Sequence, residues 1–285
     1  MKALVVSSDA GGANQLLHFT LNNKSLEDYS KFYFLKEPAL GIFKKKLKLK
    51  NLELSSTLKK ISEFDLVICS NSILGLEKIV MFESLKKKIK TWVLFDHWVR
   101  YEERLAYKNY ILNPEKIIVF DKYAQSLARK KYDIQVELVK NYYLDSIRSE
   151  FNSCNFSNNA IYIAEPEINE TKATKREWEN FQFSALMNEI SYIESTGILK
   201  KNNIRKLIVR LHPSLKTMKN FKSKSFELES SNRPIEKSLS EVNICFGKNS
   251  YALYIASKLK LKTYSISKGL YNREISIPSN IIIEI

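Results

Sequence analysis

Short apolar runs alternate along the chain with longer stretches in which apolar side chains recur every three or four positions. The short runs are rich in Val, Ile and Leu, which favours strands buried on both faces of a sheet. The longer stretches are amphipathic and favour helices that cover those faces. In the first half, the pattern predicts strands at Lys2–Ser7, Lys31–Leu35, Asp65–Ser70, Thr91–Phe95 and Lys116–Phe120, and helices at Gly11–Leu21, Leu74–Leu85 and Tyr123–Lys131.

A stretch rich in Ser and Asn, Ser149–Asn159, interrupts this pattern and is interpreted as a linker. The alternation then restarts, with predicted strands at Ala160–Ala164, Lys206–Leu211, Val242–Phe246, Lys262–Ile266 and Ile281–Glu284, and helices at Lys175–Thr196 and Asn249–Leu259. Two such arrays joined by one linker predict an α/β fold. We expect two Rossmann-like domains, residues 1–152 and 153–285, that face each other across a cleft.

The chain has 285 residues, 44% of them apolar and 27% charged, which is typical of a globular protein with room for two domains. Its formal net charge is +15. The lysine runs Lys44–Lys50 and Lys86–Lys90 are interpreted as solvated faces, with contact to an anionic membrane surface as the alternative. Basic charge also permits nucleic-acid binding, but no RRM, KH, zinc-finger or helix-turn-helix signature accompanies it. No nucleic-acid partner is therefore expected.

The three cysteines, Cys69, Cys154 and Cys245, lie far apart and form no CxxC pair. This spacing disfavours a disulfide framework or a zinc knuckle and favours a reducing compartment. The amino-terminal apolar run is too short for a signal peptide, and no run approaches the length of a membrane span. We expect a cytoplasmic protein, with peripheral contact at the inner face of the membrane as a further expectation.

Ligands of parallel sheets bind beyond the carboxyl ends of the strands, so the residues after each strand carry the functional predictions. Asp9, Gly11, Gly12 and Asn14 follow the first strand at a strand-to-helix turn. Glycines allow a ligand to approach the backbone there, and the start of a helix offers N–H groups. These four residues are predicted to bind substrate. The alternative is a tight turn in which Asp9 caps the helix.

The fourth predicted strand is followed by the densest polar and aromatic cluster of the chain, DHWVRYEER. Asp96 opens this cluster and is predicted to act as a general base, because a cleft can tune the pKa of a carboxylate at a strand end. His97 and Arg100 are predicted to bind substrate, and a plain surface turn is the alternative. Asn71 and Ser72, after the third strand, are interpreted as a helix cap.

In the second half, Arg210 ends a strand and His212-Pro213 follow it. The proline restricts the backbone around His212, whose imidazole is suited to donate to a phosphate oxygen or to act as an acid. Glu165 and Glu167 follow another strand and are interpreted either as solvated or as functional carboxylates.

A candidate nucleotide site follows the predicted strand that ends at Phe246. Gly247, Lys248, Asn249 and Ser250 lie at the turn into the next helix. A hydroxyl, backbone amides and one cation at such a turn predict phosphate binding. The alternative is that Ser250 only caps the helix.

These motifs together resemble GT-B glycosyltransferases of bacterial surface polysaccharides, especially the sialyltransferase-like and Kdo-transferase-like families that use CMP-activated sugars. The matching positions are Asp96 in FDHW, His212-Pro213 in VRLHPS and Ser250 in FGKNSYAL. The resemblance implies that Asp96 deprotonates the acceptor hydroxyl and that His212 stabilises or protonates the leaving phosphate. It also implies an acceptor-side first domain and a nucleotide-binding second domain, where Arg210, Pro213 and the turn from Gly247 to Ser250 hold the donor.

The predicted function is transfer of a sugar from a nucleotide-activated donor, CMP-linked by this resemblance, to a bacterial cell-surface glycan such as lipopolysaccharide or capsule. The acceptor is expected to be a glycan or a lipid-linked glycan. No DxD motif is present, so metal independence is predicted, and no cofactor is expected. The first alternative is a nucleotide-sugar epimerase or hydrolase on the same fold, which needs no acceptor. The second alternative is a non-enzymatic basic binding protein.

Overall fold

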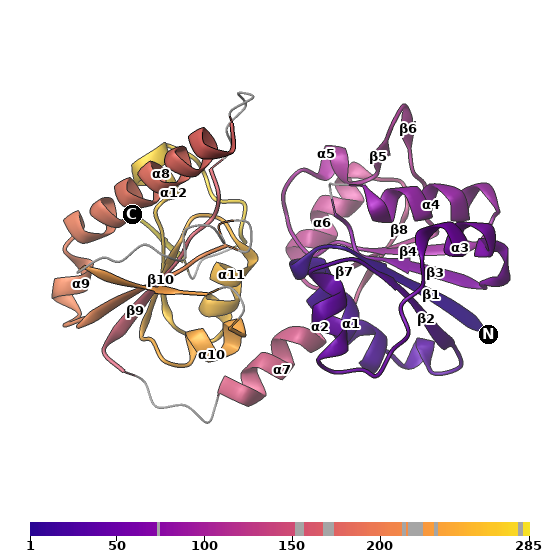
Figure 1. Cartoon of the computed structure of the whole chain (residues 1–285), viewed down its shortest axis with the longest axis horizontal. Helices are drawn as coiled ribbons and strands as arrows, with labels where there is room; N and C mark the ends of the chain where they lie inside the picture. Colours follow the sequence, from indigo (N-terminus) through magenta and orange to yellow (C-terminus); the bar gives the residue numbers. More distant parts are fainter. Residues whose placement is uncertain are drawn as a thin grey trace. The chain divides into compact units, whose positions relative to one another are not determined.

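The computed structural model describes residues 1–72, 75–151, 157–167, 174–212, 215, 225–230, 233–278 and 282–285. The chain divides into two compact units, Met1–Ser146 and Ile147–Ile285 (Figure 1). Within the described residues, each unit contains one parallel sheet of six strands with helices packed against it. This arrangement confirms the predicted α/β class and the two Rossmann-like domains. The predicted cleft and the assignment of acceptor and nucleotide to particular domains stay predictions.

The first unit has the strand order β2-β1-β3-β4-β7-β8, with every neighbouring pair parallel. Its strands are β1 (Lys2–Ser7), β2 (Ser30–Leu35), β3 (Leu66–Cys69), β4 (Lys90–Leu94), β7 (Lys116–Val119) and β8 (Gln135–Leu138). Its helices are α1 (Ala10–Asn22), α2 (Ala39–Lys44), α3 (Leu54–Lys59), α4 (Leu76–Lys86), α5 (Tyr101–Arg104) and α6 (Lys122–Lys131), with 3₁₀ turns at Lys24–Leu26 and Ile61–Glu63. A two-stranded antiparallel hairpin, β5 (Ala106–Tyr107) and β6 (Tyr110–Ile111), projects from this unit beside α4 (Figure 1).

The second unit repeats the plan with the strand order β11-β10-β9-β12-β13-β14, again all parallel. Its strands are β9 (Asn159–Ile163), β10 (Lys206–Arg210), β11 (Phe226–Glu229), β12 (Ile244–Gly247), β13 (Lys262–Ser265) and β14 (Ile282–Glu284). Its helices are α8 (Lys175–Ser195), α9 (Ile198–Lys201), α10 (Ile235–Leu239), α11 (Tyr251–Lys258) and α12 (Ser267–Tyr271). Helix α7 (Tyr142–Phe151) crosses the division between the units.

The strands that lie inside the sheets match their predicted ranges within two residues, because apolar side chains fill both of their faces. The sequence missed β8 and β11, one of the two outer strands of each sheet. Each is four residues long and buries only part of its side chains, so neither shows a continuous apolar run. The predicted linker was wrong at its start, since Ser149–Phe151 belongs to α7.

Helix boundaries depend on local capping. Asp9 caps α1, because its side chain accepts a hydrogen bond from the Gly12 amide. The cap predicted at Ser72 was wrong: α4 begins after Gly75, whose φ of 104° is in the left-handed region that favours glycine. Cys69 and Cys245 are buried free thiols, and Cys154 lies outside the described residues. Among the helices of the described ranges, none has both the length and the apolar character to cross a membrane.

Candidate functional site

The carboxyl ends of β1 and β4 bring two aspartates together in the first unit. Asp9 follows β1 and Asp96 follows β4, with only β3 between these strands in the sheet. A Cβ placed on Gly11 would lie 2.8 Å from Asp96 Oδ2 and 3.6 Å from Asp9 Oδ1. Both carboxylates therefore approach the same glycine, and a side chain at this position would displace them. The structure thus groups the predicted residues Asp9, Gly11, Gly12 and Asp96.

Asp9 has one satisfied and one unsatisfied carboxylate oxygen. Oδ1 accepts the Gly12 N–H at 2.7 Å, whereas Oδ2 is buried without a hydrogen-bond partner in the described part of the chain. Burial, with the negative charges of Asp96 and Glu77, raises the pKa of Asp9 to about 7, against the opposing effects of the Gly12 amide and Arg104. A carboxyl group with such a pKa exchanges its proton near neutral pH, as an acid–base catalyst must.

Asp96 is ion-paired to a buried arginine that the sequence analysis left without a role. Arg104 Nη1 contacts Asp96 Oδ1 at 3.2 Å, and Arg104 Nε donates to the Val99 carbonyl at 3.0 Å. The guanidinium also lies over the Phe95 ring, 5.2 Å from its centroid. These contacts fix the position of Asp96, whose side chain keeps 15% of its surface exposed. Arg104 is the last residue of the polar cluster that begins at Asp96. Its place in that cluster is the sequence feature that could have identified it as a candidate site residue.

Two further polar groups lie at these strand ends. Glu77, from the first turn of α4, accepts hydrogen bonds from the Ser8 amide and from the Ser8 and Ser70 hydroxyls, and burial raises its pKa. Asn71, just after β3, is 4% exposed, and neither of its amide atoms has a hydrogen-bond partner among the described residues. An unsatisfied buried amide is costly, so Asn71 is a candidate ligand contact rather than the predicted cap.

The other residues predicted around the first sheet make local contacts. The Asn14 side chain donates to the Ala10 carbonyl one turn earlier in α1, at 2.9 Å. His97 Nδ1 accepts the Trp98 amide hydrogen at 2.9 Å. Arg100, at a φ of 57°, pairs with Glu103, and about half of each of these two side chains is exposed. Roles for Asn14, His97 and Arg100 in substrate binding stay predictions.

In the second unit, Lys248 is enclosed by acidic residues. Its ammonium group donates to the Glu165 carbonyl at 2.8 Å, to Glu167 Oε1 at 2.7 Å and to Glu189 Oε1 at 2.8 Å. These three contacts use the three N–H bonds of the ammonium group. Tyr162 and Tyr271 add hydrogen bonds to Glu189, each at 2.6 Å. The sequence assigned Lys248 to a donor phosphate; this role stays a prediction and requires an exchange of partners.

The amides predicted to hold a phosphate contact a carboxylate instead. Glu165 Oε1 accepts the Lys248 amide at 3.1 Å and the Asn249 amide at 2.8 Å. Burial raises the pKa of Glu165, while these amides and the Lys248 charge act against that shift. Ser250 caps α11 through the Leu253 amide, as the alternative interpretation expected. A phosphate at this turn has to displace Glu165 or bind nearer to Ser250.

Three residues predicted to act on the nucleotide, Arg210, His212 and Pro213, lie at or just after the end of β10. Arg210 is buried, with Nη1 donating to Glu229 Oε1 and to Ser238 Oγ, both at 2.8 Å. Partial desolvation lowers the pKa of His212, which favours the neutral imidazole at pH 7. Pro213 lies outside the described residues. Nucleotide binding by Arg210 and Pro213, and the catalytic role of His212, stay predictions.

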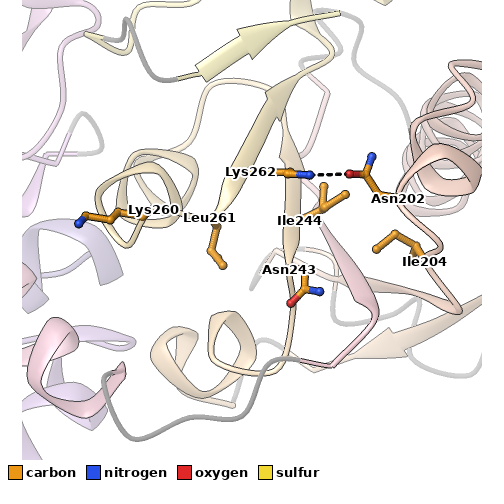
Figure 2. A pocket seen from close by; sticks show the side chains of 7 residues that line it. All are labelled: Asn202, Ile204, Asn243, Ile244, Lys260, Leu261 and Lys262. Atoms are coloured by element: carbon orange, nitrogen blue, oxygen red, sulfur yellow. Dashed lines mark hydrogen bonds between the residues drawn. The ribbon is translucent and has the colours of Figure 1, made fainter.

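Two hollows in the second unit differ in their relation to these strand ends. One, of about 320 Å³, lies at the amino-terminal ends of β12 and β13, away from the predicted site, where Lys262 donates to Asn202 at 2.7 Å (Figure 2). The other, of about 420 Å³, adjoins the acidic residues around Lys248. It is lined by Glu167, Phe181, Ser184, Ala185, Asn188, Leu270, Tyr271 and Arg273.

No protein-family model matches this sequence, and no curated protein matches it. Solved structures do resemble the fold. A UDP-N-acetylglucosamine 2-epimerase from Rickettsia bellii superimposes with a TM-score of 0.60 at 10% identity, over 93% of this chain and 79% of that one. The UDP complex of Staphylococcus aureus MnaA gives 0.56 at 13% identity over the same shares. The UDP complex of Anabaena Alr3699/HepE gives 0.53 at 8% identity, over 100% and 85%.

At these identities the likeness establishes the fold, which is the two-domain GT-B arrangement of Rossmann-like units named by the resemblance in the sequence. The neighbours include UDP-N-acetylglucosamine 2-epimerases and the glycotransferase of kitacinnamycin. Two of them are complexes with UDP rather than with a cytidine nucleotide.

Proposed function

We propose that this protein is a glycosyltransferase that transfers a sugar from a nucleotide-activated donor to a hydroxyl group of a glycan. The observation that carries the proposal is the convergence of the Asp9 and Asp96 carboxylates on Gly11 at the carboxyl end of the first sheet. One of these groups, Asp9, has a buried oxygen with no hydrogen-bond partner among the described residues, and a pKa of about 7. The GT-B fold supports a nucleotide-sugar substrate, because its solved neighbours include nucleotide-sugar enzymes.

In the proposed reaction, the Asp96 carboxylate accepts the proton of the acceptor hydroxyl, and the acceptor oxygen forms a bond to the anomeric carbon of the donor. The bond from that carbon to the phosphate oxygen breaks, and the nucleotide leaves. Arg104 holds Asp96 in place through its ion pair. His212, as a neutral imidazole, donates a hydrogen bond to the leaving phosphate, and Ser250 at the start of α11 binds the same phosphate.

The finer identity of the substrates rests on the resemblance in the sequence. We propose a CMP-linked sugar donor and a cell-surface glycan or lipid-linked glycan acceptor, as in lipopolysaccharide or capsule synthesis at the inner face of the membrane. UDP-linked donors are the alternative, because two neighbours are complexes with UDP.

An epimerase or hydrolase is the second candidate, and the same aspartate pair favours it. Epimerisation needs one group that removes a proton and another that returns one. Asp9, with its pKa of about 7, and Asp96, in its ion pair with Arg104, are the two candidate groups. Incubation of each nucleotide sugar without acceptor separates the candidates, because only an epimerase or hydrolase forms an epimer or a free sugar.

The central test is Asp96→Asn, which keeps the shape of the side chain and removes its basicity. We expect transfer from the accepted nucleotide sugar to fall by roughly 10²–10⁴-fold, while the dissociation constant of the nucleotide stays unchanged. Asp121→Asn is the matched control, because Asp121 also caps a helix of the first unit and accepts hydrogen bonds from Ala124 and Trp98. Full activity of Asp96→Asn together with an inactive Asp9→Asn assigns the base to Asp9 instead.

A further inference from the structure

The hairpin formed by β5 and β6 exposes large apolar side chains. Tyr110 has 58% of its surface exposed and Ile111 has 66%, and as consecutive residues of β6 they point to opposite faces of the hairpin. The apolar surface continues onto α4, because the Phe82 ring lies 5.3 Å from the Tyr107 ring and 5.4 Å from the Tyr110 ring, measured between centroids. The projecting hairpin therefore carries an aromatic and aliphatic surface that no described residue covers.

The base of this hairpin is firmly attached to the unit. Lys78 Nζ donates to the Glu103 carbonyl at 2.7 Å and to the Ala106 carbonyl at 2.8 Å. The Leu112 amide donates to the Leu105 carbonyl at 2.8 Å, and both leucine side chains are buried. These contacts hold the hairpin in one position, so its exposed side chains are presented outward at little entropic cost.

Positive charge surrounds the apolar surface. Lys86 lies over the Phe82 ring at 5.4 Å and Lys108 over the Tyr107 ring at 5.4 Å, and both lysines are exposed. Exposed Lys87 and Lys88 continue the run at the end of α4. Lys86 also lies 3.8 Å from Glu83, one turn earlier in α4. The surface therefore combines exposed apolar side chains on β6 with exposed lysines at the turn of the hairpin and at the end of α4.

We propose that the β5–β6 hairpin, together with Lys86–Lys88, docks this protein onto an anionic lipid bilayer. Tyrosine rings and aliphatic side chains partition into the interface between headgroups and acyl chains, while lysines contact the anionic headgroups. Two exposed apolar side chains on β6 cover far less area than a stable protein interface buries, which disfavours a second copy as the occupant. This inference does not depend on the proposed reaction.

The test measures co-sedimentation of the full chain with phosphatidylcholine vesicles that contain about 30 mol% phosphatidylglycerol, at about 0.1 M salt. We expect wild-type protein to bind these vesicles and not pure phosphatidylcholine. The double variant Tyr110→Ser, Ile111→Ser should lose about tenfold in partitioning, because its apolar anchor is removed. The single variant Ile111→Ser is a milder form should the double one misfold, and circular dichroism checks each fold.

Two charge-reversal variants locate the docking surface. Lys86, Lys87 and Lys88, all changed to Glu, should abolish vesicle binding. Lys44, Lys45 and Lys48 are exposed residues of the other lysine run, at and after the end of α2, and changing all three to Glu alters the net charge equally. This control should bind vesicles within about threefold of wild type.

Three groups of results overturn the proposal. The first is equal binding of wild-type protein to neutral and anionic vesicles, or binding to neither. The second is an equal loss in the two lysine variants, which indicates general attraction by net charge. The third is unchanged binding of the Tyr110→Ser, Ile111→Ser variant, or a dimer in solution that this variant abolishes.

Discussion

At the scale of single residues, two effects act on the pKa of Asp9 in opposite directions. Its Oδ1 caps α1, which favours the ionised carboxylate, whereas burial beside Asp96 and Glu77 favours the protonated acid. The balance raises its pKa from 3.8 to about 7. In the unfolded chain the same group ionises near pH 4, so between these two values the folded state binds the proton more tightly.

This linkage predicts a pH-dependent difference between wild type and Asp9→Asn. The folded state binds more protons than the unfolded state, so the free energy of unfolding of wild type falls as the pH rises from about 4 to about 7 and then levels off. Asn keeps the capping oxygen and carries no charge. The melting temperature of Asp9→Asn, measured by calorimetry, should therefore exceed that of wild type by a margin that widens over this range. A margin that is constant between these pH values contradicts the raised pKa.

At the scale of elements, the start of α1 lies very close to the end of β3. A Cβ on Gly12 would be 2.7 Å from Ser70 Cβ and 2.9 Å from Asp9 Oδ2. Ser70 Cβ is attached directly to the backbone and cannot turn away. Only glycine allows α1 to approach the sheet this closely, and the approach sets the position of Asp9 and its neighbours.

Gly12→Ala should therefore lower the free energy of unfolding by about 1–3 kcal/mol, measured by urea denaturation, through overpacking against β3. Gly41→Ala is the matched control, because Gly41 lies within α2 and its added Cβ would meet only the end of the Glu37 side chain, at 3.1 Å. That change should stabilise by about 0.5–1 kcal/mol through helix propensity. If the two substitutions change the free energy of unfolding similarly, the close contact between Gly12 and the end of β3 does not limit which residue fits at position 12.

At the scale of the whole molecule, the net charge of +15 attracts polyanions without selectivity. Specific nucleotide binding has to be recognised by its dependence on the base and by a weak response to salt. A thermal-shift panel of CMP, UDP, GDP and their sugars provides this comparison, because a ligand of the native state raises the melting temperature.

Within that panel, Ser250→Ala should weaken binding of the preferred nucleotide by roughly 10–150-fold, because it removes one hydrogen bond to a charged phosphate. Binding of the corresponding nucleoside should change little. Thr174→Ala controls for the loss of a helix cap, since Thr174 caps α8 in the same unit. If the two variants bind the nucleotide equally well by isothermal calorimetry, the phosphate is not held at Ser250.

The sequence alone determined the α/β class, the two domains and most inner strands, because a strand buried on both faces needs a continuous apolar run. It also singled out Asp9 and Asp96, since ligands of parallel sheets bind at strand ends. Only the tertiary structure decided that these two carboxylates meet at Gly11 and that Arg104 pairs with Asp96. It also decided that the side-chain amide of Asn71 is buried with no hydrogen-bond partner in the described part of the chain. Such contacts join strands that are neighbours in the sheet but distant along the chain, and a local pattern of residues carries no record of that adjacency.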